Sequence, residues 1–159
     1  MIIVDSLIQF GIATVATIAF AILFSAPKKE LLFCGFTGGL GWLVYYVMTA
    51  YEMNIILSAA VATFVLTIFA RAFAVVRRVP ATVYLVAGIF PLVPGAGIYY
   101  TAYFLFNTGS GDAGAKAIET FELAGAIVFG IIFGFAIPQK LFQKIRKPEQ
   151  YDTYVEGQE

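Results

Sequence analysis

Long apolar stretches separated by clusters of charged residues are the main pattern of this sequence. No Asp, Glu, Lys or Arg occurs within residues 6–27, 31–51, 53–70, 79–111 and 123–139. A helix needs about 20 apolar residues to cross a hydrocarbon core of about 30 Å, so four of these stretches have the length of one membrane span each. The stretch 79–111 is long for one span and short for two. We therefore predict five membrane-spanning helices, near residues 4–26, 31–50, 54–72, 81–106 and 118–138.

The apolar residues follow one another without the alternation of apolar and polar positions that the strands of an outer-membrane barrel require. The pattern therefore predicts an all-α integral membrane protein. The composition agrees, because 60% of the 159 residues are hydrophobic and only 13% are charged, with a mean hydropathy of +0.86. Soluble domains are about a quarter charged. We predict one transmembrane domain over residues 1–148 and a polar cytoplasmic tail over residues 149–159.

The basic residues predict the orientation of the chain. With five spans, the loops 27–30 and 71–78 and the tail from residue 139 lie on one side of the membrane. Nine of the ten Lys and Arg residues fall on this side, and Lys116 lies opposite. The positive-inside rule then places this side, with the C-terminus, in the cytoplasm and the N-terminus outside. A re-entrant hairpin over residues 79–111 would put the basic tail on the wrong side, so we favour a single span there.

The residue types exclude several classes of function. There is no histidine, which removes most metal sites and every His-based catalytic arrangement. The single cysteine, Cys34, cannot form an internal disulfide. Ten basic residues balance ten acidic ones, so no surplus of positive charge points to nucleic acid. We expect no enzyme activity, no metal, no cofactor and no nucleic-acid partner.

Small residues spaced four apart mark helix faces that can pack closely within lipid. Gly35 and Gly39 form one such G-x-x-x-G pair, and Gly130 and Gly134 form another. These pairs serve either packing within one chain or contact with a second protein. Five short helices enclose little space for a transport pathway, which favours a homo-oligomer or a hetero-oligomer in the lipid bilayer.

The segment 87–99 predicts a break in the fourth span. Pro91 and Pro94 lack an N–H group, so a continuous helix would leave the carbonyls of Ala87 and Phe90 without donors. Free carbonyls at mid-membrane are costly unless they are buried in protein or line a wet cavity. We therefore expect an interrupted helix, at mid-membrane, that lines such a cavity. The alternative is a proline-kinked helix without a ligand.

A second half-helix that starts near Pro94 would direct its free N–H groups and its positive dipole end at the break. Transporters hold anionic substrate groups at such points, so we expect a small-molecule carboxylate there. Tyr99 can add a hydroxyl group. The predicted substrate-binding residues are Pro91, Pro94, Gly95, Gly97 and Tyr99.

Acidic residues near the membrane are candidates for ion coupling. Asp5, Glu52, Glu119 and Glu122 all lie near predicted helix ends, where charge is tolerated. Glu122 is the deepest of them in its apolar stretch. It is our candidate for a coupling carboxylate.

Two segments resemble a known family. Arg71 followed by Val-Pro-Ala at 79–81 and Phe-Pro-Leu-Val-Pro-Gly-Ala-Gly-Ile-Tyr at 90–99 is similar to the small membrane module of the bacterial threonine/serine exporter family. Residues 38–45 resemble the second helix of that module. The resemblance implies a subunit of a secondary exporter in the bacterial inner membrane, which acts with a larger membrane subunit of the family. The chain looks like the split type of this exporter. Its implied substrates carry a carboxylate: threonine and serine, or succinate.

Two other functions remain open at this point. A non-transporting assembly or scaffold subunit would need little polarity at mid-membrane, and the break at 90–97 argues against it. A self-sufficient homo-oligomeric small transporter usually carries an acid in the middle of its first helix. Residues 6–24 contain none.

Overall fold

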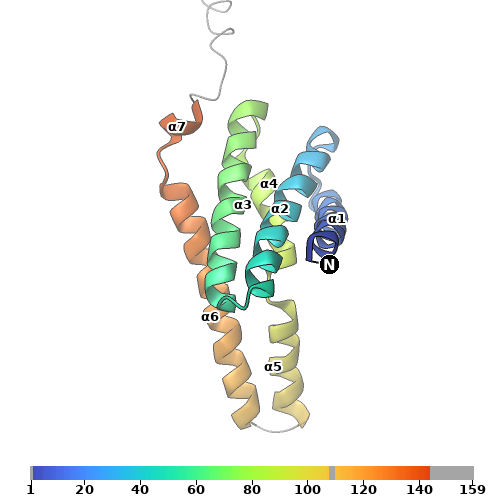
Figure 1. Ribbon diagram of the computed structural model, residues 1–159, viewed down its shortest axis with the longest axis vertical. Coiled ribbons are helices and arrows are strands. Elements are labelled where there is room, and N and C mark those ends of the chain that lie inside the picture. Colours follow the sequence, from blue (N-terminus) through green and yellow to red (C-terminus); the bar gives the residue numbers. More distant parts are fainter. Residues whose placement is uncertain (1, 108–109, 144–159) are drawn as a thin grey trace, which may run out of the picture.

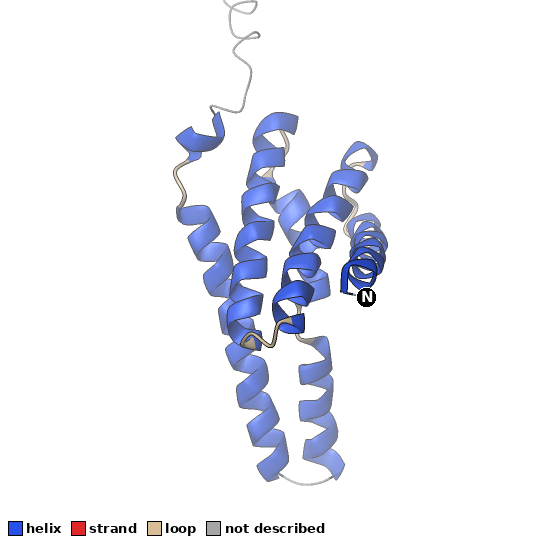
Figure 2. Ribbon diagram, viewed as in Figure 1, coloured by secondary structure: helices blue, strands red, loops and turns tan. Residues whose placement is uncertain are grey.

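The computed structural model describes residues 2–107 and 110–143, and every regular element in this part of the chain is a helix (Figure 2). The predicted tail over residues 149–159 lies outside the described residues. Four helices are each long and apolar enough to span a membrane, and α4 with α5 passes the same test as one bent pair. This confirms the predicted all-α membrane protein with about five spans. The elements are α1 Ile2–Leu23, η1 Lys28–Glu30, α2 Leu31–Ala50, α3 Ile55–Arg77, α4 Ala81–Ile89, η2 Phe90–Leu92, α5 Gly95–Asn107, α6 Ser110–Ala136 and α7 Gln139–Gln143.

The long helices form a bundle in which α2 packs between α1 and α3, and α3 packs against α6 (Figure 1). The short helix α4 contacts α1, α2 and α3. One end of the bundle carries η1, the turn between α3 and α4, and α7. We call it the basic end, after Lys28, Lys29, Arg71, Arg77 and Arg78. The turn at residues 51–54 lies at the opposite end, which we call the far end.

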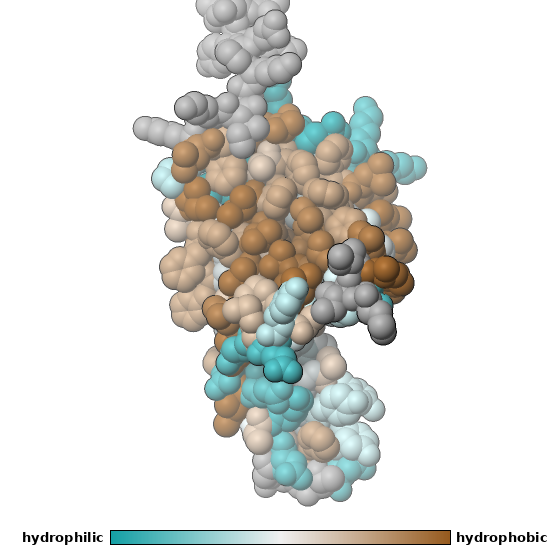
Figure 3. Space-filling view, in the orientation of Figure 1, coloured by the Kyte–Doolittle hydropathy of each residue, from teal (hydrophilic) through white to brown (hydrophobic). Residues whose placement is uncertain are grey.

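A hairpin of α5 and the first half of α6 projects past the far end of the bundle (Figure 1). Hydrophilic residues gather over this hairpin, whereas hydrophobic residues form a broad band over the bundle (Figure 3). The helix that contains the predicted fifth span, 118–138, is longer than that span, because α6 starts at Ser110 and has 27 residues. Its first half carries charges, and Lys116 Nζ pairs there with Glu119 Oε2 at 2.8 Å.

The glycine pairs are used for packing within the chain. Gly35, Gly38 and Gly39 face α1, and Gly130 and Gly134 face α3. A Cβ atom on any of these five glycines would lie under 3.0 Å from atoms of the facing helix. Packing within one chain is therefore the alternative that the structure supports, and these faces are not open to a second protein.

The third helix is longer than predicted. The expected span ended at residue 72 with a loop over 71–78, whereas α3 continues to Arg77 and Arg78 ends it in a left-handed conformation with φ 57°. The charges of its last two turns have partners: Arg71 reaches α6 and Arg77 reaches Glu30. A charged turn can stay helical at the edge of the membrane when its charges are bonded to neighbouring elements.

Candidate functional site

The helix is interrupted between α4 and α5. The short turn η2 follows α4, Val93 is extended, and Pro94 directly precedes α5, whose axis is turned by 48° from that of Ala81–Leu92. The N–H of Val93 donates to the carbonyls of Ile89 and Phe90, at 3.2 Å each. The Phe90 carbonyl, expected to lack a donor, therefore has one, because the chain tightens into a 3₁₀ turn there.

The first turn of α5 presents backbone amides at the interruption. Gly95 N–H donates to Val93 O at 2.7 Å and Ile98 N–H donates to Pro94 O at 3.1 Å. The amides of Ala96 and Gly97 between them are the ones that a helix start leaves without an intrahelical acceptor. Apart from the adjacent residues and the backbone of α5 itself, no atom of the described residues lies within 4 Å of the position that a Cβ on Gly95 would take, so this side of the turn is open.

The interruption begins in the core of the bundle, where Leu92 is buried with Leu66 of α3, and it ends near the far end (Figure 1). Gly97 packs against Thr120 of α6, and the neighbouring Glu119 shares a hollow with Met53 and Asn54 of the turn between α2 and α3. The depth of this break in the membrane stays a prediction. In the structure α4 and η2 pack inside the bundle, and α5 continues along α6 outside it.

An apolar groove of about 540 Å³ runs between α5 and α6 and includes Pro94. Tyr99 and Glu122 are exposed, and neither lines this groove. Tyr99 stacks on Tyr103, with ring centroids 6.2 Å apart. Pro91 is half-buried in η2. The structure thus brings Pro94 and the Gly97–Thr120 contact together, whereas Tyr99 and Glu122 are exposed outside the groove.

A buried acidic residue at the basic end was missed by the sequence analysis. Glu30 is 5% exposed. Its Oε1 accepts from Arg77 Nη2 at 2.8 Å, and its Oε2 accepts from Arg77 Nε at 3.0 Å and from Tyr84 Oη at 2.6 Å. This cluster joins η1, α3 and α4. The sequence feature that could have pointed to Glu30 is its position directly after Lys28 and Lys29, on the side of the membrane that carries nine of the ten basic residues.

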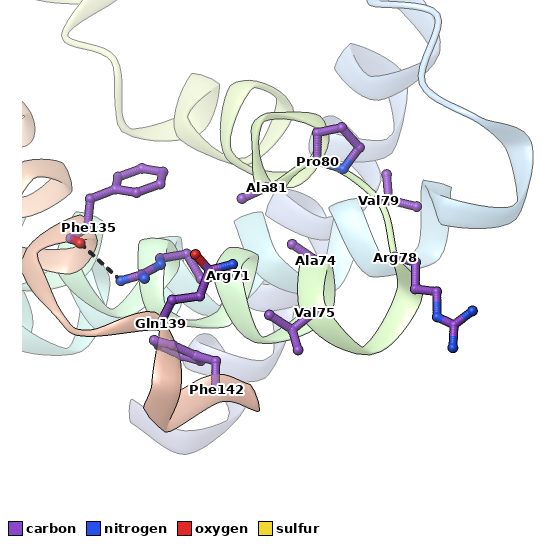
Figure 4. Close-up of a pocket in the computed structure, with 10 residues that line it drawn as sticks. All are labelled: Arg71, Ala74, Val75, Arg78, Val79, Pro80, Ala81, Phe135, Gln139 and Phe142. Atoms are coloured by element: carbon purple, nitrogen blue, oxygen red, sulfur yellow. Dashed lines mark hydrogen bonds between the residues drawn. The ribbon is translucent and has the colours of Figure 1, made fainter. Parts of the chain in front are cut away.

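Arg71 is the second buried charge at this end. It is 8% exposed, and its Nη1 donates to the carbonyls of Gly134, Phe135 and Ile137 at 2.7, 3.2 and 2.7 Å. A cation is favourable at these carbonyls, because they are the last of α6 and carry the negative end of its dipole. Arg71 also lines a cavity of about 390 Å³ at the basic end (Figure 4).

No metal centre is evident, since among the described residues no group of three or more His, Cys, Asp or Glu side chains could hold a metal ion.

Comparison with known proteins places this geometry in context. An uncharacterized protein of Haemophilus influenzae is 26% identical over 140 residues, which cover 86% of this chain and 47% of that protein. A protein of Corynebacterium glutamicum named threonine/serine exporter is 26% identical over 143 residues, which cover 88% of this chain and 28% of that protein. The chain therefore spans less than half the length of these curated relatives. No solved structure matches.

Residues 9–137 match the protein family described as "Threonine/Serine exporter, ThrE". The match extends from the first half of α1 to just past the end of α6, and it includes both Arg71 and the interruption between α4 and α5. Together with the apolar helices, it identifies a multi-pass inner-membrane protein. The chain belongs to the threonine/serine exporter family.

Proposed function

We propose that this chain is the membrane-embedded part of a secondary exporter that moves small carboxylate-bearing metabolites out of the bacterial cell. Family membership supports the exporter role, and the name of the Corynebacterium relative supports threonine and serine as substrates. Succinate-like dicarboxylates share the carboxylate. The match covers less than half of each relative, which supports our proposal that a larger membrane subunit acts with this chain in a hetero-oligomer.

The open start of α5 is the observation that carries this proposal. The amides of Ala96 and Gly97 and the positive end of the α5 dipole can accept a carboxylate. Pro91 and Pro94 fix the interruption, because neither can continue a helical hydrogen-bond ladder. At Gly95 the missing side chain lets a ligand approach the backbone.

The remaining substrate and coupling roles are assigned by exposure. Tyr99, exposed beside the interruption, supplies a hydroxyl group to the rest of the substrate. Glu122 is the coupling carboxylate, since it is exposed on α6 and has no ion pair among the described residues, whereas Glu119 is bonded to Lys116. In the predicted orientation the site lies on the release side of the membrane.

The test is efflux of labelled threonine, serine and succinate from loaded cells that express this chain alone or with a larger family subunit of the same organism. We expect efflux with both proteins, at a rate that Gly95→Leu lowers about tenfold or more by covering the amides. Gly114→Leu is the matched control, because Gly114 lies in the same hairpin and also has nothing within 4 Å. Glu122→Gln should remove the dependence on a pH gradient, and Glu119→Gln should keep it.

Three other results of the efflux experiment would contradict parts of this proposal. Efflux at the normal rate by the Gly95→Leu protein, present at the normal level in the membrane, would remove the substrate site from α5. Efflux by this chain alone would favour a self-sufficient homo-oligomer. If no label leaves although both proteins are in the membrane, a non-transporting assembly subunit becomes the better interpretation.

A further inference from the structure

Arg71 is a buried cation whose hydrogen-bond partners among the described residues are carbonyl groups and not an acid. Both ion pairs among the described residues involve other side chains, Arg77 with Glu30 and Lys116 with Glu119. The Arg71 guanidinium lies 4.7 Å from the ring centroid of Phe142 and 5.5 Å from that of Phe135. Carbonyl dipoles and aromatic faces stabilise a cation without neutralising it. A net positive charge therefore remains at this position.

Two of the three nitrogens of the Arg71 guanidinium make no hydrogen bond to the described chain. The three hydrogen bonds of Arg71 all come from Nη1, so Nε and Nη2 donate to no atom of the described chain. No buried side-chain nitrogen or oxygen among the described residues lacks a partner, so these two nitrogens are not enclosed by protein. They form the side of the guanidinium fork that binds a carboxylate through two parallel hydrogen bonds.

The cavity beside Arg71 has the size of a small-molecule site. Its volume of about 390 Å³ lies within the range of about 300–1,000 Å³ that is usual for ligand pockets. Its wall combines the aromatic rings of Phe135 and Phe142, small apolar residues of α3 and α4, and the amide of Gln139. Figure 4 shows Arg71 between Phe135 and Gln139, whereas Arg78 at the other side of the cavity points away.

We propose that this cavity is a second substrate site, at which Nε and Nη2 of Arg71 bind the carboxylate of the exported solute. The proposal rests on the exporter function proposed above. It places an entry site at the basic end, which the positive-inside rule assigns to the cytoplasm. The short helix α4, about 14 Å long at 1.5 Å per residue, then separates this entry site from the amides of α5.

Substitution of Arg71 cannot test this site by itself, because it also removes the donors that cap α6. Filling the cavity from α4 avoids the problem. Ala81 lines the cavity, whereas the adjacent Thr82 is exposed and lines a different hollow. We expect Ala81→Leu to raise the apparent KM for intracellular threonine about tenfold or more, as for the loss of charge-assisted hydrogen bonds. The matched variant Thr82→Leu should keep the normal KM.

A second measurement reports on the guanidinium directly. The full chain, with its larger subunit where efflux needs one, is placed in phosphatidylcholine nanodiscs so that no anionic headgroup competes. It is treated with phenylglyoxal, and modification of Arg71 is followed by mass spectrometry. Threonine, serine or succinate should slow this modification at least fivefold, whereas threoninol, which lacks the carboxylate, should not. An Arg71 that does not react without solute, or that reacts equally fast with threonine and with threoninol, would overturn the proposal.

The two proposals fail in different ways. If efflux proceeds but Ala81→Leu matches Thr82→Leu and no solute protects Arg71, the entry site is wrong and the exporter function stands. If no solute leaves the cell but threonine protects Arg71, the site binds carboxylates and the exporter function is wrong.

Discussion

At the scale of single residues, Glu30 is the side chain whose replacement should lower the stability of the fold most. It bonds a guanidinium of α3 and a hydroxyl of α4 while it is itself buried. Glu30→Gln should lower the free energy of unfolding by about 2 kcal/mol, because the Arg77 charge would lose its partner. Denaturant unfolding in detergent measures this loss. Glu119→Gln removes an exposed ion pair and should cost about 0.5 kcal/mol at most. Equal losses in the two variants would show that the Glu30 cluster adds no stability.

Residue chemistry explains which site features the sequence could predict. Pro91 and Pro94 act on their own backbone, so an interrupted helix could be anticipated from a short segment. The partners of Glu30 and Arg71 lie 47 to 66 residues away along the chain. No local pattern reports which backbone carbonyls or side chains meet a charge once the helices have packed. The two buried charges at the basic end therefore became visible only in the structure.

At the scale of helices, Gly130 shows how closely α6 approaches α3. A Cβ at Gly130 would press on the backbone carbonyl of Ala60 and on Thr63, neither of which can move freely. Gly130→Ala should therefore destabilise the protein by about 2 kcal/mol. Gly125→Ala, on the same helix with nothing within 4 Å, should be neutral or stabilising by up to about 1 kcal/mol. Unfolding by titration with SDS compares the two, and a stable Gly130→Ala protein would contradict this helix contact.

Helix boundaries were predictable where charges are solvated and unpredictable where they are paired. The expected span 31–50 coincides with α2, which lies between charged or polar turns on both sides. The C-terminal end of α3 and the N-terminal start of α6 were not predicted, because both helices continue through charged residues. Inside α3, Arg71 is bonded to carbonyls of α6, and outside the bundle Lys116 is bonded to Glu119. A charge ends an apolar stretch in the sequence, but it ends a helix only when nothing nearby satisfies it.

At the scale of the whole molecule, the orientation in the membrane stays a prediction that labelling can test. Lys28 at the basic end and Asp112 in the projecting hairpin are both exposed. Single cysteines at these positions, in a Cys34→Ala background, would be treated with a membrane-impermeant maleimide. Asp112→Cys should react in intact cells, and Lys28→Cys should react only after permeabilisation. The reverse result would place the basic end outside.

Few hydrogen bonds join α3 and α6 among the described residues, which bears on how these helices can move against each other. The buried threonines of α3 bond to their own helix, Thr63 to the Ala59 carbonyl and Thr67 to the Thr63 carbonyl, at 2.7 Å each. Among the described residues, the hydrogen bonds between these two helices are those of Arg71. If the packing of Gly130 against α3 loosened, α6 would turn about a pivot at the basic end, where Arg71 holds it. A rotation of about 10° along its length of about 40 Å would swing the opposite tip by about 7 Å. Because α5 packs against α6, the opening at Gly95 would travel with that swing, without breaking any hydrogen bond along the shaft.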